Sequence, residues 1–177
     1  MFSLNVPLPP AVERLAADLH PKLTGFDRVR ERYTLVGKRF GVDDVGEAGR
    51  THRSKDAAVA TLRADLRPLL AGTGPFDVSV TAVATFETPA QGPAPVVYLA
   101  VESDVLVRLH RRLCAAFDPV DGIEGDDYVP HITLARGGGS KAVDALSDVD
   151  IDPIEWRVHE LALYDPEFRE VADRIEL

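Results

Sequence analysis

Residues 128–137 read YVPHITLARG, and a histidine stands in the middle of a stretch that otherwise has the pattern of a β-strand. Alternate residues of a strand point to opposite faces, so Ile132 and Leu134 can enter a core while His131 and Thr133 share the other face. This places a titratable ring beside a hydroxyl group. The pattern predicts a polar site if a second strand presents a similar pair of side chains to face it.

The composition of the chain limits the kinds of protein it can be. Its 177 residues, 45% of them apolar, suffice for one sizeable domain, and the single Cys114 rules out an internal disulfide. No apolar run approaches the roughly 18 to 20 residues that span a bilayer, and the N-terminus lacks a signal-peptide pattern. We therefore expect a cytoplasmic protein with no membrane partner. Since the net charge is −9, a phosphate ligand needs a local basic pocket.

Apolar periodicity predicts that strands and helices alternate along the chain. The predicted strands cover residues 2–6, 31–40, 76–88, 96–102, 128–137, 154–165 and 169–177, and the predicted helices cover 10–20, 54–70, 104–117 and 141–146. A strand, helix, strand order occurs in the first half and again, about 95 residues later, in the second. An internal duplication and the ordinary rhythm of an α/β protein both fit this pattern.

The second strand of each half carries a comparable set of side chains. Laying the two strands together aligns RYTL (32–35) with HITL (131–134). In each, the second and fourth residues are apolar, while the first and third share the other face. If a twofold axis relates the halves, the two polar faces meet in one cleft, where a pair of hydroxyls and a pair of basic side chains surround the ligand. Such a cleft suits a phosphate.

Three features of the chain carry a resemblance to a known family. The stretch PHITLAR (130–136), the duplicated layout and the closing ELALYDPE (160–167) resemble the 2H phosphoesterase superfamily, specifically its 2′-5′ RNA ligase and RNA 2′,3′-cyclic phosphodiesterase group. The resemblance implies an α+β fold and a single bilobal domain over residues 1–177. Its two pseudo-symmetric lobes of antiparallel or mixed sheet are expected to carry helices on the outside and to enclose a central cleft.

The first motif departs from the family pattern. The family has an H-x-[ST] sequence in the strand of each half, yet this chain has no histidine between residues 20 and 52, where the first motif is expected. Three registers are open, with Arg32, Tyr33 or Thr34 at the histidine position. We prefer Arg32, because this register makes Thr34 the motif hydroxyl and leaves Tyr33 and Leu35 on the apolar face.

The resemblance implies a reaction that opens a 2′,3′-cyclic phosphate on an RNA end or a nucleotide, without cofactor or metal. One histidine acts as base and the other as acid, which imidazole suits because its pKa of roughly 6.5 lies near the working pH. The implied catalytic residues are His131 as acid/base, with Thr133 and Thr34 as phosphate-binding hydroxyls. Because one missing acid/base partner commonly costs about 10² to 10⁴ in rate, we expect reduced activity.

The polar residues beside the two motifs are candidates for holding the substrate. We expect binding by Arg32, Tyr33, Lys38 and Arg136. Arginine grips phosphate through a forked pair of donors, although strand-end charges such as Lys38, Arg39 and Arg136 are often simply solvated. His110 is expected on the surface of its helix, and the protein is expected to be a monomer. An inert module that binds a nucleotide or RNA-end phosphate, and a structural domain without ligand, are the alternative functions.

Overall fold

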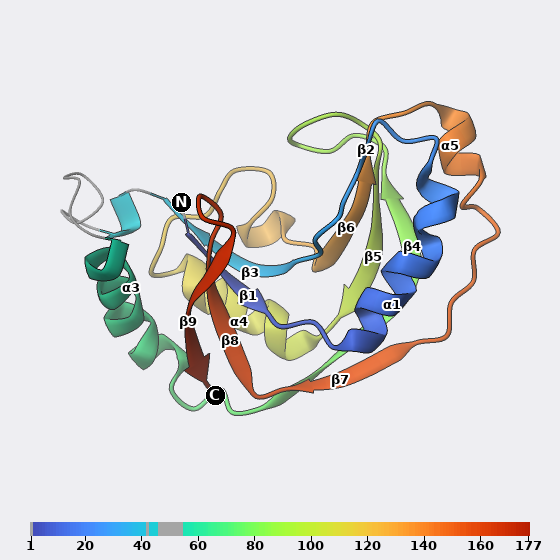
Figure 1. Ribbon diagram of the computed structural model, residues 1–177. Helices are drawn as coiled ribbons and strands as arrows, with labels where there is room; N and C mark the ends of the chain where they lie inside the picture. Colours follow the sequence, from blue (N-terminus) through green and yellow to red (C-terminus); the bar gives the residue numbers. More distant parts are fainter. Residues whose placement is uncertain (1, 42, 46–54) are drawn as a thin grey trace.

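One curved antiparallel sheet with helices packed against it forms the framework of the protein (Figure 1). The computed structural model describes residues 2–41, 43–45 and 55–177. The strands are β1 Phe2–Val6, β2 Arg28–Val29, β3 Leu35–Phe40, β4 Phe76–Phe86, β5 Val96–Glu102, β6 His131–Arg136, β7 Ile154–Val158, β8 Glu160–Asp165 and β9 Glu170–Glu176. The helices are α1 Pro10–Leu19, α3 Lys55–Leu70, α4 Asp104–Cys114 and α5 Ser140–Asp144, with 3-10 turns η1 His20–Leu23, η2 Asp43–Val45 and η3 Gly125–Asp127.

The order of the strands divides the sheet into two lobes. The order is β7-β4-β5-β6-β3-β1-β8-β9, with β2 attached to β6. We call β7-β4-β5-β6 the β5 lobe and β3-β1-β8-β9 the β1 lobe. The lobes join through the pair Leu35↔Ile132 of β3 and β6. The predicted α+β class and bilobal layout are confirmed, and the strand pairs described are antiparallel.

The same irregularity occurs in the register of both lobes. The pairing of β1 with β3 shifts at Gly37, and the pairing of β5 with β6 shifts at Leu134. Each of these residues lies two positions after the central pair, Leu35↔Ile132. A twofold axis through that pair therefore relates β3 to β6 and brings one bulge onto the other. Of the two explanations of the repeated strand, helix, strand order, the structure supports the internal duplication.

Two strands pair with a strand from the other half of the chain. β4 follows the first half but pairs with β5, and β8 follows the second half but pairs with β1. The continuous strand predicted over 154–165 is therefore wrong. It breaks at His159, where β7 ends beside β4 in the β5 lobe and β8 begins in the β1 lobe. The large apolar residues stand at positions 154, 156 and 158 in β7 and at 161 and 163 in β8, so the alternation changes phase at the polar pair His159 and Glu160. That change of phase is the sequence signal of the break.

Alternation and helix periodicity explain the remaining elements. Ile132 and Leu134 of β6 are fully buried, and a connected core of apolar side chains runs through both lobes. Ser103 caps the N-terminus of α4, because its hydroxyl accepts a hydrogen bond from the Leu106 N–H, and the helix packs on β3. The predicted strand over 31–40 shortens to β3, and Ser54 of the predicted second helix lies outside the described residues. In the described residues, no helix has the length and apolarity to cross a membrane.

Candidate functional site

A cavity of about 400 Å³ lies where the two lobes meet. The facing strands β3 and β6, with the residue before β3, contribute Thr34, Val36, Arg39, His131, Thr133 and Arg136 to its lining. Arg30 and Arg32 come from the segment that leads into β3, and the remaining walls come from the loops around residues 86–96 and 122–129. The cavity has the size of a small-molecule site. The predicted cleft between the two motif strands is thus present, with five of the predicted residues in it: Arg32, Thr34, His131, Thr133 and Arg136.

The strand pairing establishes the register of the first motif. The twofold axis through Leu35↔Ile132 relates Thr34 to His131 and Val36 to Thr133. Our preferred register, with Arg32 at the histidine position, is therefore corrected to the register with Thr34 there. A shift of two residues leaves every side chain on the same face of a strand, so alternation alone does not distinguish the two registers. In this chain the first motif has lost both its histidine and its hydroxyl residue.

The same axis relates two arginines that line the cavity, Arg39 and Arg136. Arg39 stands three positions after Val36, and Arg136 stands three positions after Thr133. Strict alternation would turn a residue at that spacing away from the cavity, but the bulges at Gly37 and Leu134 bring both arginines back to the cavity face. From the sequence, Arg39 is a candidate either for the lining of the cleft or for a solvated strand-end charge, and the structure places it in the lining. The repeated spacing between Thr34 and Arg39 and between His131 and Arg136 is the signal that reveals the pair.

The environment of His131 suits a proton acceptor. Its Nδ1 lies 2.7 Å from the carbonyl oxygen of Val129, and because a carbonyl only accepts, Nδ1 carries the hydrogen. Nε2 of the neutral ring is then free to take a proton. Burial lowers the pKa of His131, and the charges of Arg39 and Arg136 lower it further, against the opposing effect of the Val129 carbonyl. At neutral pH the ring is therefore an uncharged base.

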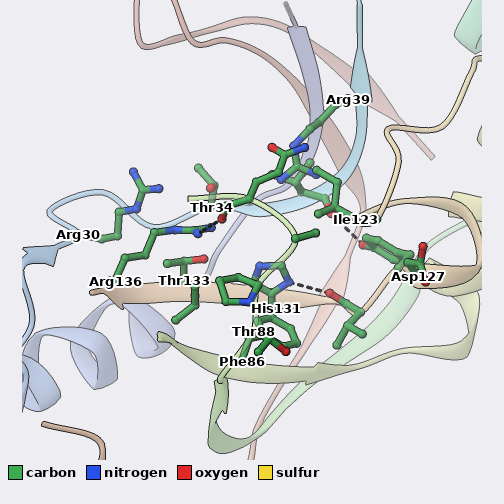
Figure 2. A pocket seen from close by; sticks show the side chains of 18 of the residues that line it. Arg30, Thr34, Arg39, Phe86, Thr88, Ile123, Asp127, His131, Thr133 and Arg136 are labelled. Atoms are coloured by element: carbon green, nitrogen blue, oxygen red, sulfur yellow. Dashed lines mark hydrogen bonds between the residues drawn. The ribbon is translucent and has the colours of Figure 1, made fainter. Parts of the chain in front are cut away.

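Aromatic side chains and the arginines define the surroundings of that ring. The centroid of the His131 ring lies 5.2 Å from that of Phe86 and 5.4 Å from that of Tyr98, both approached edge to face. Figure 2 shows His131 between two ends of the cavity, with Arg30 and Arg136 at one end and Asp127 at the other. This local group of cations, in a chain of net charge −9, is the basic pocket that a phosphate ligand requires.

The structure does not bring Lys38 and Tyr33 to the cavity. Lys38 is fully buried, and its Nζ lies 2.7 Å from Oε2 of Glu124 while it also donates to the backbone carbonyls of Arg39 and Asp118. Tyr33 is partly buried against the core, where desolvation raises its pKa. Neither residue is among those that line the cavity, and Lys38 is not a solvated strand-end charge either.

Glu124 joins the wall of the cavity to β3. Its carboxylate accepts hydrogen bonds from the backbone N–H groups of Arg39, at 2.7 Å, and Val120, at 3.1 Å, besides pairing with Lys38. A further oxygen–nitrogen distance of 3.7 Å connects it to the guanidinium of Arg39. A buried ion pair completed by hydrogen bonds in this way holds its surroundings in one geometry. Glu124 therefore positions Arg39, and no sequence motif marks it.

His110 belongs to the same buried network, which corrects its predicted surface location. Its Nδ1 donates to the carbonyl of Gly37 over 2.7 Å, and its Nε2 accepts from the N–H of Gly125 over 2.8 Å. The ring stacks on Tyr128, with centroids 3.7 Å apart, and the Tyr128 hydroxyl donates to the carbonyl of Val36. The loop that contains Asp127 is thereby fixed to the bulge of β3.

Comparisons with known proteins match the chain to one family. Residues 34–167 match the family described as the 2′-5′ RNA ligase superfamily. A curated protein named RNA 2′,3′-cyclic phosphodiesterase, from Methanothermobacter thermautotrophicus, is 31% identical over 132 residues. That alignment covers 71% of this chain and 65% of the relative, so the chain spans slightly less than two thirds of the relative's length.

Solved structures share the fold over almost the whole chain. TT0787 of Thermus thermophilus has a TM-score of 0.64 and 21% identity, with 99% of this chain and 97% of that chain covered. The E. coli protein LigT in complex with 3′-AMP has a TM-score of 0.58 and 18% identity, covering 99% and 94%. LigT in complex with NADP+ has a TM-score of 0.59 and 17% identity, with 99% of this chain and 96% of that chain covered. The similarity confirms the α+β architecture deduced above.

Proposed function

Because the chain belongs to the 2′-5′ RNA ligase superfamily, we propose that it is a phosphodiesterase that opens the 2′,3′-cyclic phosphate of an RNA end or a nucleotide. The observation that carries the proposal is the neutral ring of His131, which presents a free Nε2 to a cavity lined by arginines. A cyclic phosphate is an anion that needs both a base to activate water and cations to hold its oxygens. The name of the Methanothermobacter relative supports the same chemistry.

The side chains of the cavity have separate parts in this reaction. Nε2 of His131 takes a proton from water as the water oxygen forms a bond to phosphorus. The guanidinium groups of Arg39 and Arg136 stabilise the charge on the nonbridging oxygens, with hydroxyls from Thr133 and Thr34 as further donors. The bond between phosphorus and one ribose oxygen breaks, and that oxygen takes a proton. The products are a phosphomonoester and a free ribose hydroxyl.

The changed first motif limits the rate of this reaction. The attacking and leaving oxygens lie roughly in line on opposite sides of phosphorus, so His131 serves only one of them. Thr34, at the position related to His131, carries no group that exchanges a proton near neutral pH. The leaving oxygen then takes its proton from water. The absent acid/base partner is expected to cost about 10² to 10⁴ in rate.

A second candidate function is supported by the same change. Both residues of the first motif are replaced, by Thr34 and Val36, while the paired Arg39 and Arg136 are present in the cavity. A protein with this lining can hold a phosphate without hydrolysing it. The second candidate is therefore a module that binds the phosphate of a nucleotide or RNA end.

Hydrolysis of an oligonucleotide that ends in a 2′,3′-cyclic phosphate tests the proposal. We expect slow turnover by the wild-type protein and a loss of at least about 100-fold in His131→Ala. His159→Ala, which replaces an exposed histidine at the junction of β7 and β8, is the matched control and should behave like wild type. Equal turnover by His131→Ala overturns the mechanism. Saturable binding of the oligonucleotide without turnover favours the binding module.

A further inference from the structure

The positive charge of the cavity exceeds what one cyclic phosphate requires. A cyclic phosphodiester carries a single negative charge, whereas the lining includes the four arginines Arg30, Arg32, Arg39 and Arg136. Among the described residues that line the cavity, Asp127 alone is a carboxylate. The cations therefore remain in excess after one such phosphate has bound, and like charges close together in a partly buried site repel one another. A ligand with a further negative group relieves that repulsion.

The four arginines differ in the partners they already have. Arg39 lies beside the carboxylate of Glu124. The guanidinium of Arg32 donates to the carbonyl of Arg169 at the turn between β8 and β9, at 3.0 Å. By contrast, the guanidinium of Arg30 makes no hydrogen bond or ion pair with any residue that the structure describes. Its charge is therefore the one most available to a ligand.

The backbone holds Arg30 firmly at one end of the cavity. Its N–H donates to the carbonyl of Leu134 at 2.8 Å, directly after β2 pairs with the end of β6. Figure 2 shows Arg30 beside Arg136, on the other side of His131 from Asp127. Burial and then the charges of Arg30 and Arg39 lower the pKa of Arg136, which agrees with this proximity. An anchored backbone that carries a cation without a partner among the described residues is a suitable place to bind an anion.

We propose that Arg30, next to Arg136, forms a second phosphate subsite, so that the ligand carries a further phosphate besides the one that faces His131. The inference rests on the proposed function for the identity of the first phosphate. Two sources share this chemistry: the neighbouring internal phosphodiester of an RNA chain, and the 5′-phosphate of a mononucleotide. In both, a ribose separates the second phosphate from the cyclic one.

Calorimetric titration with three probes tests the subsite. The probes are adenosine 2′,3′-cyclic phosphate, the same nucleotide with a 5′-phosphate, and the dinucleotide ApA with a 2′,3′-cyclic end. Chromatography after each titration verifies that the probe is intact. Wild type should bind at least one of the two-phosphate probes about tenfold more tightly than the one-phosphate probe, as a charge-assisted contact at an exposed arginine predicts. Tighter binding of only the 5′-phosphate probe identifies a mononucleotide, and of only the dinucleotide an RNA chain.

Arg30→Gln should abolish most of that preference, because its affinity for the two-phosphate probes should fall by a larger factor than its affinity for the one-phosphate probe. Arg108→Gln, which replaces an exposed arginine of α4 outside the cavity, is the matched control and should keep the preference. The subsite is refuted if wild type has no preference, or if the preference survives in Arg30→Gln. Turnover is measured separately. A preference that depends on Arg30 in a protein without turnover supports the subsite and refutes the proposed hydrolysis. Turnover without a preference that depends on Arg30 supports the hydrolysis and refutes the subsite.

Discussion

The twofold axis predicts which substitutions rebuild a second acid/base group. Thr34→His with Val36→Thr restores an H-x-T sequence at the positions related to His131 and Thr133. The Thr34 side chain is exposed, so an imidazole enters without displacing the core, and Val36 is only half-buried. The leaving oxygen then has a proton donor on its side of phosphorus. Turnover of the 2′,3′-cyclic oligonucleotide should rise by about 10² to 10⁴, the usual contribution of one general acid/base.

Arg32→His is the matched control for this double variant. It introduces the same ring on the same face of the chain, two residues earlier, at the histidine position of the register that the strand pairing excludes. Both proteins are assayed with the same oligonucleotide between about pH 5 and pH 9. The double variant should also acquire a bell-shaped pH profile, because two groups now titrate, whereas Arg32→His should show no gain in rate.

Two outcomes of this experiment refute the reasoning. A gain in Arg32→His without a gain in the double variant refutes the register deduced from the strand pairing. No gain in either variant, with thermal melting that shows both to be folded, refutes the inference that the absent histidine limits the rate.

Three further predictions follow from the buried and titrating groups. Glu124→Gln leaves Lys38 buried without its counter-ion and should lower the free energy of unfolding in urea by about 3 to 5 kcal/mol; a change below about 1 kcal/mol contradicts the role of the pair. His131 acts as a neutral base and its pKa is lowered chiefly by burial, so activity should fall on acidification with a midpoint below about pH 6.5. Arg136→Gln removes a charge that also lowers this pKa and should move the midpoint upward. An unchanged midpoint argues against an interaction between His131 and Arg136. Burial lowers the pKa of His110, so below about pH 6.5 the unfolded state binds a proton that the folded state excludes. The free energy of unfolding should therefore decrease as the pH falls, and it should decrease less in His110→Gln. An equal decrease in the variant shows that another group causes the pH dependence.

Much of the fold could be predicted from periodicity, since the strands carry strong local signals. The alternation in YVPHITLARG correctly places Ile132 and Leu134 in the core and His131 and Thr133 together on the cavity face. The helices over 10–20 and 104–117 are also found, each slightly shorter than predicted. These predictions succeed because they depend on which face a residue occupies, and a few neighbouring residues determine that face.

The parts that could not be predicted depend on partners far away in the sequence. The register of the first motif is visible only in the pair Leu35↔Ile132 and in the two bulges. The burial of Lys38 depends on Glu124, which lies in a distant loop and has no motif around it. Similarly, the break at His159 reflects a change of pairing partner, from β4 to β1. The polar pair His159 and Glu160 interrupts the alternation there, but it does not identify the new partner.

The exchange of β4 and β8 between the halves has a consequence for how this chain can be divided. A cut in the loop between β4 and β5 produces an N-terminal piece whose last strand has no neighbour, and a C-terminal piece in which β5 and β7 lack the strand between them. The two pieces are interlocked parts, and neither is a miniature of the whole. Expressed separately they should remain unstructured, and mixed together they should assemble into one folded particle that melts in a single transition, with the cavity restored at their junction.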